Sequence, residues 1–434
     1  MKDKNQAVFQ KNTKAEFGGD LARALLGCRR VFANQWKDSQ QIARIQNQKL
    51  QRIVHSAYSN VGYYRRIFDE AGVGPDRIEN VEDLRKIPLT TKAELQKWSV
   101  HDRLHRGFSA KTLARQHSSG STGQPFTVYY DRGYHMIRNM LFLRGLMAAG
   151  YRFGRKIELI TDSGKKEKKL LRWHYCSILD SPERILASLN ANKPDLVYGC
   201  KTPLIRLAEH IVHSGVQVHK PGCIISTAEL LDAESRLLLE SVFSARVLDF
   251  YGSTEMGLVG WQCSEGRGYH VSADSVIIEL LPVDAASGLS KMVMTNLDLM
   301  AMPFIRYDSG DLCTDFFEGQ CGCGRTLSRI QKVEGRQVDC IKMRDGRMIS
   351  PYRVTCAMEK ILGVLKYQVI QTDWDDFTVN VQCRSSDATA AKDAVRKTMY
   401  RLLGNGVRIH LASDAAVQAP VEGKFRVVKS LVRG

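Results

Sequence analysis

Short apolar runs that alternate with helical patterns constrain the fold of residues 127–250 more strongly than any other feature of the sequence. The runs lie at residues 157–160, 196–198, 223–225 and 246–250. Because strands that alternate with helices build a parallel sheet covered by helices, we predict a largely parallel α/β sheet here. A strand with alternating side chains, at residues 126–130, leads into this region.

The flanking regions follow different patterns. Residues 41–65 place apolar side chains at helical spacing. Helical patterning continues to residue 98, with breaks at residues 72–75 and 88–91, and Thr91 is a candidate N-cap. After residue 261, strand-like runs at 276–280, 291–295 and 311–315 are separated by turns, as in an antiparallel sheet or barrel. Beyond residue 336, strands near 368–370 and 377–381 and a helix at 390–403 indicate a small α+β domain.

The predicted fold class is therefore α/β, with two domains in 434 residues. Residues 1–336 form a large domain of helix-covered, mostly parallel sheets and a small antiparallel sheet or barrel, in which residues 1–100 are a helical supporting region. Residues 337–434 form the small α+β C-terminal domain. The linker is predicted at residues 336–339.

The net charge of +17 limits the classes of partner. The basic residues are dispersed, and the densest run, residues 165–169, lacks the interleaved aromatic residues of a single-strand binding surface. No helix-turn-helix or RNA-binding signature is present, so we predict no nucleic-acid partner. A solvated basic face and an acidic protein partner, such as an acyl carrier protein, both fit.

Neither a signal peptide nor a membrane span is predicted, because the first residues have no apolar core and no apolar stretch is long enough to span a bilayer. We therefore expect a cytoplasmic protein without membrane insertion. In a reducing compartment, the eleven cysteines would be buried small hydrophobes, metal ligands or a catalytic thiol rather than disulfides.

Three polar segments suit a nucleotide. Residues 118–125 crowd hydroxyls and glycines into one turn, which suits phosphate oxygens, although the lysine of a Walker motif is absent. Residues 249–255 offer an aromatic ring, Tyr251, and a carboxylate, Glu255, that could hold Mg²⁺. In residues 304–311, Asp311 could accept hydrogen bonds from a ribose. Each segment has an alternative reading, as a polar surface turn or a strand-end turn with an acidic residue.

Four soft ligands form a further candidate site. Cys263 and His270 lie on one turn-rich stretch, and Cys321 and Cys323 follow some fifty residues later. Two such pairs fit a closed, tetrahedral structural Zn²⁺ site. The spacing departs from the usual pair of Cys-x-x-Cys knuckles, and buried free thiols are the alternative.

Six segments, in chain order, resemble motifs of the acyl-adenylate-forming enzymes, specifically the phenylacetate-CoA ligase-like branch. They are the phosphate loop, the adenine-side segment, the YGxTE core, the RYxxGD motif, the hinge and the C-terminal lysine motif. The corresponding residues are 118–125, 226–229, 251–255, 306–311, 333–336 and 422–424. The resemblance runs from about residue 41 to the end of the chain.

The resemblance implies a two-step reaction that uses ATP, Mg²⁺ and a thiol. A carboxylic acid substrate attacks the α-phosphate to give an acyl-AMP and pyrophosphate, and coenzyme A or an acidic acyl carrier protein then takes the acyl group. The residues implied in these roles are Ser119, Ser121, Thr122 and Gly123 for the β- and γ-phosphates; Ala228, Glu229, Tyr251, Gly252 and Ser253 for the adenine side; Thr254 and Glu255 for the α-phosphate and Mg²⁺; and Asp311, assisted by Arg329, for the ribose.

Lys424 corresponds to the catalytic lysine that the family delivers with its mobile C-terminal domain. Its alternative reading is a solvated lysine in a basic tail, because Arg426 and Lys429 flank it. The branch often carries a Cys…GxH and CxCGR pair, which favours Zn²⁺ at Cys263, His270, Cys321 and Cys323. The other cysteines are read as structural, except that Cys200 falls where the family lines its acyl pocket.

Two departures from the family pattern bear on function. Residues 161–169 replace a longer insertion of the aryl-acid ligases, which indicates either a more polar acid or a simple solvated loop. Val338 replaces the first of two hinge aspartates and leaves Asp339, so the domain pivot could move to Gln337 or the second half-reaction could change.

We therefore predict an AMP-forming acid-thiol ligase with coenzyme A as the acceptor. A close variant loads a carrier protein. A different class of protein, a non-catalytic nucleotide-binding protein or scaffold in a polysaccharide pathway, is disfavoured because Glu255, Asp311 and Lys424 are all present.

Overall fold

A nine-stranded sheet runs through the larger part of the molecule, in the order β14-β15-β10-β9-β8-β7-β6-β4-β5. The computed structural model describes residues 29–118, 126–161, 172–284, 288–317, 319–358, 361–383, 388–412 and 426–432. The half of the sheet that spans β5 to β8 is entirely parallel. Its strands are β4 (Ile157–Thr161), β5 (Trp173–Ser177), β6 (Leu196–Cys200), β7 (Cys223–Thr227) and β8 (Arg246–Ser253).

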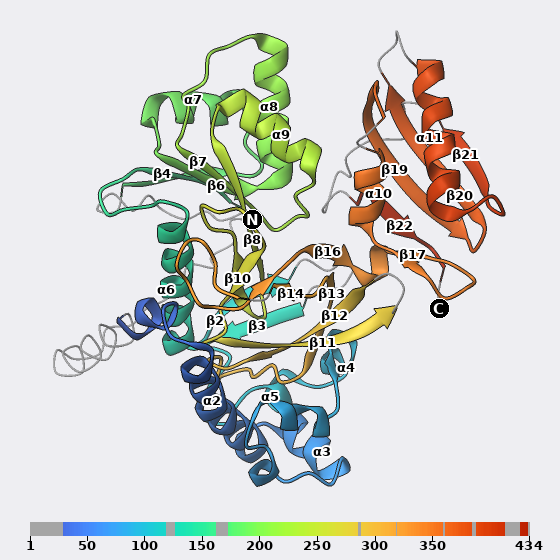
Figure 1. Ribbon diagram of the computed structural model, residues 1–434. Coiled ribbons are helices and arrows are strands. Elements are labelled where there is room, and N and C mark those ends of the chain that lie inside the picture. The colour runs from blue at the N-terminus through green and yellow to red at the C-terminus, as the bar shows by residue number, and fades with distance from the viewer. Residues whose placement is uncertain are drawn as a thin grey trace.

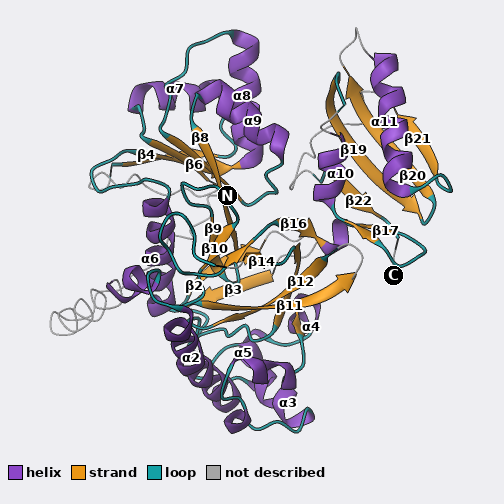
Figure 2. Ribbon diagram, viewed as in Figure 1, coloured by secondary structure: helices purple, strands orange, loops and turns teal. Residues whose placement is uncertain are grey.

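Helices alternate with these strands, as the apolar runs predicted. α7 (Pro182–Asn192), α8 (Lys201–Ser214) and α9 (Ala233–Phe243) share one core cluster with side chains of β4, β6, β7 and β8. Figures 1 and 2 show the three helices grouped on one side of the strands. The predicted helix-covered parallel sheet is confirmed.

The other half of the sheet is antiparallel and belongs to residues after β8. Each of its pairs, from β8 to β14, runs antiparallel. The strands are β9 (Gly257–Trp261), β10 (Tyr269–Val271), β15 (Arg329–Ile330) and β14 (Phe316–Phe317).

A second sheet has the order β1-β13-β12-β11, with β16 paired to β13. Its strands are β1 (Thr90–Thr91), β11 (Val276–Asp284), β12 (Leu289–Asn296), β13 (Tyr307–Cys313) and β16 (Val333–Arg336). The predicted antiparallel arrangement holds for β11, β12, β13 and β16, whereas β1 pairs with β13 in parallel. The strand predicted at 311–315 instead runs from Tyr307 to Cys313, because Tyr307 and Asp308 pair with β1 on one edge and with β12 on the other.

The N-terminal helical region begins with an amphipathic helix, as predicted. α2 (Ser39–Asn60) buries one stripe of apolar residues, but it ends at Asn60 rather than at residue 65, because Val61 is extended. α3 (Gly62–Glu70) follows, and residues 75–86 then form two short 3₁₀ turns, η1 (Pro75–Arg77) and η2 (Val81–Lys86). Thr91 caps α4 (Lys92–Gln96) by accepting from Glu94 N, as predicted, and α5 (Val100–Arg103) is short.

A hairpin and one long helix complete the larger part. β2 (Ala114–Ser118) pairs with β3 (Phe126–Tyr130), and Ser118 lies opposite Phe126 at the end that leads into residues 119–125. α6 (Arg132–Ala148) follows at once, capped by Asp131, which accepts from Tyr134 N.

Residues 341–428 enclose a core of their own. A four-stranded sheet in the order β21-β20-β19-β22 contains β19 (Val364–Asp373), β20 (Asp376–Cys383), β21 (Arg408–Ala412) and β22 (Val428–Ser430). α10 (Pro351–Met358) and α11 (Ala388–Leu403) accompany it, with β17 (Ile341–Lys342) and β18 (Met348–Ile349) as a small ribbon. Figure 1 shows this part beside the larger one, joined through β16 and η4 (Gln337–Asp339).

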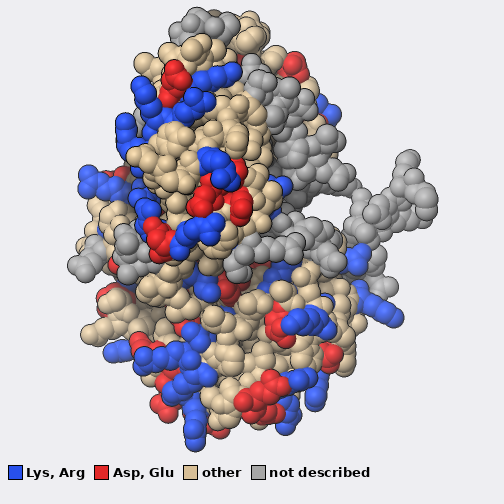
Figure 3. All heavy atoms as spheres, turned by 90° about the vertical axis from the view of Figure 1, so that its right-hand side faces the viewer, with Lys and Arg blue, Asp and Glu red and all other residues tan. Residues whose placement is uncertain are grey.

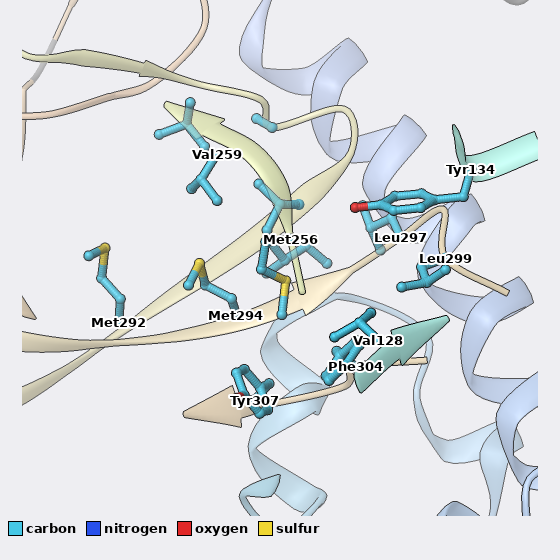
Figure 4. Close-up of a cluster of buried hydrophobic side chains, with 14 of the residues drawn as sticks. Val128, Tyr134, Met256, Val259, Met292, Met294, Leu297, Leu299, Phe304 and Tyr307 are labelled. Carbon is cyan, nitrogen blue, oxygen red and sulfur yellow. The ribbon is translucent and has the colours of Figure 1, made fainter. Parts of the chain in front are cut away.

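The largest core cluster joins the two sheets of the larger part to the N-terminal helices. Figure 4 shows its centre, where Met256 from the turn after β8 lies near Met294 of β12. Among the helices that the structure describes, none is both long enough and apolar enough to cross a bilayer.

Candidate active site

The turn that follows β8 holds Glu255 between the two sheets. Glu255 is 7 % exposed, and its backbone carbonyl accepts a hydrogen bond from Asn296 Nδ2 at 3.0 Å. The Tyr307 hydroxyl lies 3.3 Å from Glu255 Oε1. Met256 N donates to Ser253 Oγ at 3.1 Å, which closes the turn, and the Met256 side chain enters the core. The predicted metal-binding carboxylate is therefore fixed by both sheets.

Burial raises the pKa of Glu255 above its usual range, although hydrogen bonds to Ser253 and Tyr307 act in the opposite direction. A carboxylate in a poorly solvated place gains most from a nearby cation. Lys92, the first residue of α4, is a cation of this kind. Its charge interacts with Glu255, and burial lowers the pKa of Lys92. From the sequence, Lys92 was predicted only to lie in a helix. No motif indicated that its charge would interact with Glu255.

Close packing explains the glycine of the same turn. A Cβ at Gly252 would lie 2.4 Å from the carbonyl oxygen of Gly257, a backbone atom of the facing strand β9. Next to it, the Thr254 carbonyl accepts a 2.6 Å hydrogen bond from the Tyr130 hydroxyl of β3. The hairpin that carries residues 119–125 is thereby tied to the Tyr251–Glu255 segment.

Tyr251 and Asp311, predicted separately as nucleotide ligands, meet in the structure. The Tyr251 hydroxyl donates to Asp311 Oδ2 at 2.6 Å. Burial and the Asp311 carboxylate raise the pKa of Tyr251, so the phenol stays protonated and acts as the donor. Arg336 Nε lies 3.4 Å from Asp311 Oδ1, across the β13–β16 pairing. Sequence reasoning assigned Arg336 to the hinge and missed this contact, which only strand register reveals.

Arg329 lies in a different place from the one predicted. Its guanidinium approaches the carbonyls of Arg267 and Gly319 at 3.5 Å and covers the Phe317 ring at 5.0 Å. On β15 it is the register partner of His270. Arg329 therefore lines the cysteine-histidine cluster, and Arg336 is the arginine that the structure places against Asp311.

Ala228 and Glu229 follow β7, next to the carboxyl end of β8. Ala228 has φ of +68°, a left-handed conformation that is unfavourable for a residue with a Cβ and is often found at functional sites. Glu229 accepts hydrogen bonds from Thr202 N at 3.2 Å and Thr202 Oγ1 at 2.5 Å. Parallel α/β sheets bind ligands beyond the carboxyl ends of their strands, which is where this segment lies.

Five predicted site residues lie outside the described residues: Ser119, Ser121, Thr122, Gly123 and Lys424. Their neighbours in the chain are described. β2 and β3 lead to the first four, and Arg426, two residues after Lys424, contacts Asp339 of η4 at 3.1 Å.

The predicted zinc ligands converge, although they come from three separate segments. The ligand atoms of Cys263, His270, Cys321 and Cys323 all lie within 4.8 Å of one another. Cys263 Sγ is 3.7 Å from Cys321 Sγ, and Cys323 Sγ is 3.4 Å from His270 Nε2. Two sulfurs bound to one tetrahedral zinc at about 2.3 Å each would lie about 3.8 Å apart, so the spacing fits.

The protonation states at this cluster also fit a metal. Burial, together with Arg325 and Arg329, lowers the pKa of His270 to about 4, which keeps the imidazole neutral, the form that binds metals. Burial raises the pKa of the Cys263 thiol to about 12. A bound cation is what deprotonates such a thiol.

Comparison with known proteins finds relatives that share one enzyme name. No family model matches the chain. The chain is 30% identical over 412 residues to phenylacetate-coenzyme A ligase of Pseudomonas putida, covering 88% of this chain and 90% of that protein. The enzyme of the same name from Thermus thermophilus is 28% identical over 355 residues, which cover 76% and 78%.

Solved structures show the same fold. A 2-hydroxyisobutyryl-CoA ligase in the postadenylation state superposes with a TM-score of 0.77 at 20% identity, over 92% of this chain and 91% of that one. The fold class predicted from the sequence is confirmed by this match. By its sequence relatives, the chain belongs to the phenylacetate-coenzyme A ligase family.

Proposed function

We propose that this protein is an AMP-forming acid-CoA ligase, which adenylates a carboxylic acid with ATP and then transfers the acyl group to coenzyme A. One observation carries the proposal: a fixed, buried carboxylate, Glu255, stands beside the Tyr251–Asp311–Arg336 contact at the carboxyl end of β8. An aromatic ring, a diol-binding carboxylate and a cation-binding carboxylate are the groups that an adenosine phosphate requires.

The nucleoside would bind between β7, β8 and β13. The Tyr251 ring would face the adenine, with the backbone of Ala228 and Glu229 on the adenine side. Asp311 would accept hydrogen bonds from the ribose hydroxyls, and Arg336 would hold Asp311 ionised and oriented. Tyr251 would also orient Asp311, because its hydroxyl donates a hydrogen bond to that carboxylate.

Glu255 is the residue that would hold Mg²⁺, with Thr254 beside the α-phosphate. When bound, Mg²⁺ withdraws negative charge from the phosphate oxygens during attack by the substrate carboxylate. The buried position of Glu255 fits this role, since its raised pKa reports a carboxyl that lacks solvent and gains from a cation. Ser119, Ser121, Thr122 and Gly123 would collect the leaving pyrophosphate.

Residues 337–434 would act as the mobile domain that brings Lys424 to the α-phosphate. Two observations support this division. The core of residues 341–428 is separate, and Arg426 reaches the predicted hinge at Asp339.

The TM-score is 0.77 against the postadenylation state of 2-hydroxyisobutyryl-CoA ligase and 0.64 against its thioesterification state. The arrangement here is thus nearer to the former.

Cys263, His270, Cys321 and Cys323 would hold a structural Zn²⁺. All four positions of a tetrahedral ion are taken by protein ligands, so the ion would have no open position for chemistry. Its effect would be to join the β9–β10 connection to residues 321–323, two segments of the antiparallel half of the sheet.

Coenzyme A is the acceptor in this proposal, and carrier-protein loading is the variant to compare with it. Basic and acidic side chains are interspersed over the face in Figure 3 rather than gathered into one basic block. This face therefore offers an acidic carrier no single broad basic patch.

The proposal is tested by incubating the protein with ATP, Mg²⁺, coenzyme A and a panel of carboxylic acids. The expected products, each dependent on the acid, are AMP, pyrophosphate and an acyl-CoA thioester. ADP as the nucleotide product, or no acid-dependent product with any acid, would contradict it. Replacing coenzyme A with a holo carrier protein under the same conditions distinguishes the two acceptors.

A further inference from the structure

Arg138 of α6 occupies a central place between the segments that make up the proposed active site. Its Nη1 donates to Gln116 Oε1 of β2 at 2.9 Å, and its guanidinium lies over the Tyr130 ring at 5.1 Å. A Cβ at Gly257 would be 3.4 Å from Arg138 Cγ, so the side chain also packs on the start of β9. Tyr130 thus links Arg138 to Thr254, because the Thr254 carbonyl accepts a hydrogen bond from the Tyr130 hydroxyl.

The positive charge of Arg138 is not neutralised by a carboxylate in the part of the chain that the structure describes. A guanidinium has five N–H donors, and Arg138 directs them to Gln116 Oε1 and to the Tyr130 hydroxyl, two neutral groups, so donors remain for a further acceptor. Its charge reaches the neighbouring phenols. Burial raises the pKa of Tyr198 to about 12, and Arg138 acts in the opposite direction.

An aromatic wall begins one helical turn farther along α6. We define the wall as Phe142, Trp173, Tyr198 and Phe250. The Phe142 ring is 5.0 Å from Tyr198 and 6.3 Å from Trp173, and Tyr198 is 6.2 Å from Phe250. Arg138 and Phe142 are four residues apart, so they lie on the same face of α6. Phe142 and Tyr198 are only partly buried.

The position of the substrate acid follows from the proposed function, on which this inference rests. Adenosine is assigned to the side of Tyr251 and Asp311, and the reacting carboxylate to the Thr254–Glu255 turn. The rest of the acid then extends away from adenosine, toward α6. It meets the aromatic wall together with one cation that has unused donors. Burying a purely apolar group against such a cation is unfavourable unless an acceptor pairs with it.

We propose that Arg138 binds a second oxygen acceptor of the substrate, so that the preferred acids carry a carbon skeleton for the aromatic wall and a second carboxylate or hydroxyl group. A carboxylate would gain most, because a hydrogen bond between two charged groups is about twice as strong as a neutral one.

The test compares acids that share the phenylacetate skeleton and differ only in the group at the para position. ATP–pyrophosphate exchange is measured with phenylacetate, 4-hydroxyphenylacetate and 4-carboxyphenylacetate for the wild type, Arg138→Met and Arg138→Lys. For the wild type, kcat/KM should be highest with the carboxylated acid. In Arg138→Met its advantage over phenylacetate should fall by about tenfold or more, with the KM for ATP unchanged. Arg138→Lys should retain part of the advantage, since the charge remains.

Two matched variants separate this role from a structural one. Arg132→Met removes an exposed arginine from the first turn of the same helix and should leave all ratios unchanged. Gln116→Leu removes the hydrogen bond to Arg138 but keeps the cation, and it should also preserve the preference among acids. Melting temperatures show that each variant folds.

The inference is overturned if Arg138→Met lowers kcat/KM equally for all three acids or raises the KM for ATP, because Arg138 would then only brace the hairpin that leads to residues 119–125. It is also overturned if the wild type prefers phenylacetate and Arg138→Met does not change that preference, an outcome that leaves the ligase proposal intact. No exchange with any acid would instead contradict the ligase proposal.

Discussion

Glu255 and its neighbours carry most of the proposed chemistry at the scale of single residues. The sequence predicted roles for Glu255, Tyr251 and Asp311 because each stands in a short motif that resembles one of the family. It could not show that Tyr251 donates to Asp311 or that Arg336 lies against the same carboxylate. Those contacts join residues 60 and 25 positions apart, and their geometry is set by the pairing of β13 with β16 and by packing between two sheets.

Glu255 should give the magnesium dependence a characteristic pH profile. Burial raises its pKa above the usual 4.5. The protonated form is therefore present at a higher pH than for an exposed glutamate, and Mg²⁺ affinity should be lost as the pH falls through that raised pKa. Titrating Mg²⁺ in the exchange reaction at several pH values, with ATP speciation accounted for, measures this. An apparent affinity that stays constant down to pH 4.5 would contradict it.

Arg336 should matter for nucleotide binding more than for the chemical step. Replacing it with methionine removes the cation beside Asp311, and we expect the KM for ATP to rise by about tenfold with a smaller change in kcat. Arg353→Met, an exposed arginine on α10, is the matched control and should leave both constants unchanged. A normal KM for ATP in Arg336→Met would remove Arg336 from the ribose site.

At the scale of elements, the strand-helix alternation predicted the parallel half of the large sheet because buried parallel strands are short apolar runs. The N-terminal region was harder to predict. Its helical pattern continues past residue 70, yet the chain forms 3₁₀ turns there, since Pro75 and the capping box at Asn80 favour tight turns. The β8–β9 turn shows the converse case, in which Gly252 is required by the close approach of β9 rather than by its own backbone angles.

The β8–β9 turn should not tolerate a side chain at Gly252. In Gly252→Ala, the new Cβ would meet the Gly257 carbonyl at 2.4 Å, so one strand must move and Tyr251 and Glu255 move with it. We expect a lower melting temperature and a loss of exchange activity. Gly74→Ala is the control, because Gly74 has a φ of −75° and open space around it. Unchanged melting and activity in Gly252→Ala would contradict the packing argument.

The cysteine-histidine cluster should contain about one zinc ion per chain. Cys323→Ser removes one ligand, and we expect it to lose the metal and melt at a lower temperature. Cys383→Ser, outside the cluster, should keep both properties. Elemental analysis and thermal melting measure these outcomes. A wild-type protein without zinc that melts as it does with added zinc would contradict the assignment.

At the scale of the whole molecule, we propose that the relation between the two parts decides which half-reaction is possible. Beyond the hinge, Lys366 of β19 reaches Glu209 of α8 at 3.5 Å across an exposed surface. No sequence pattern predicts this ion pair, because it depends on how two separately packed units meet. An exposed ion pair contributes little energy, so it would not prevent the proposed rotation of the C-terminal part.

Holding the two parts in this arrangement should separate the half-reactions. A flexible bis-maleimide can join cysteines introduced as Glu209→Cys and Lys366→Cys. We expect the cross-linked protein to keep acid-dependent pyrophosphate exchange and to lose thioester formation. Each single cysteine variant, treated in the same way, should keep both. Normal thioester formation in the cross-linked protein would show that the C-terminal part need not move.

The most direct test of the account is acid-dependent ATP–pyrophosphate exchange by the wild type and by Glu255→Gln, with the exposed Glu79→Gln as the control. We predict exchange in the wild type and the control, and a loss of at least about 100-fold in Glu255→Gln, because the buried carboxylate that would hold Mg²⁺ at the phosphates becomes neutral. Exchange at the wild-type rate in Glu255→Gln would contradict the account.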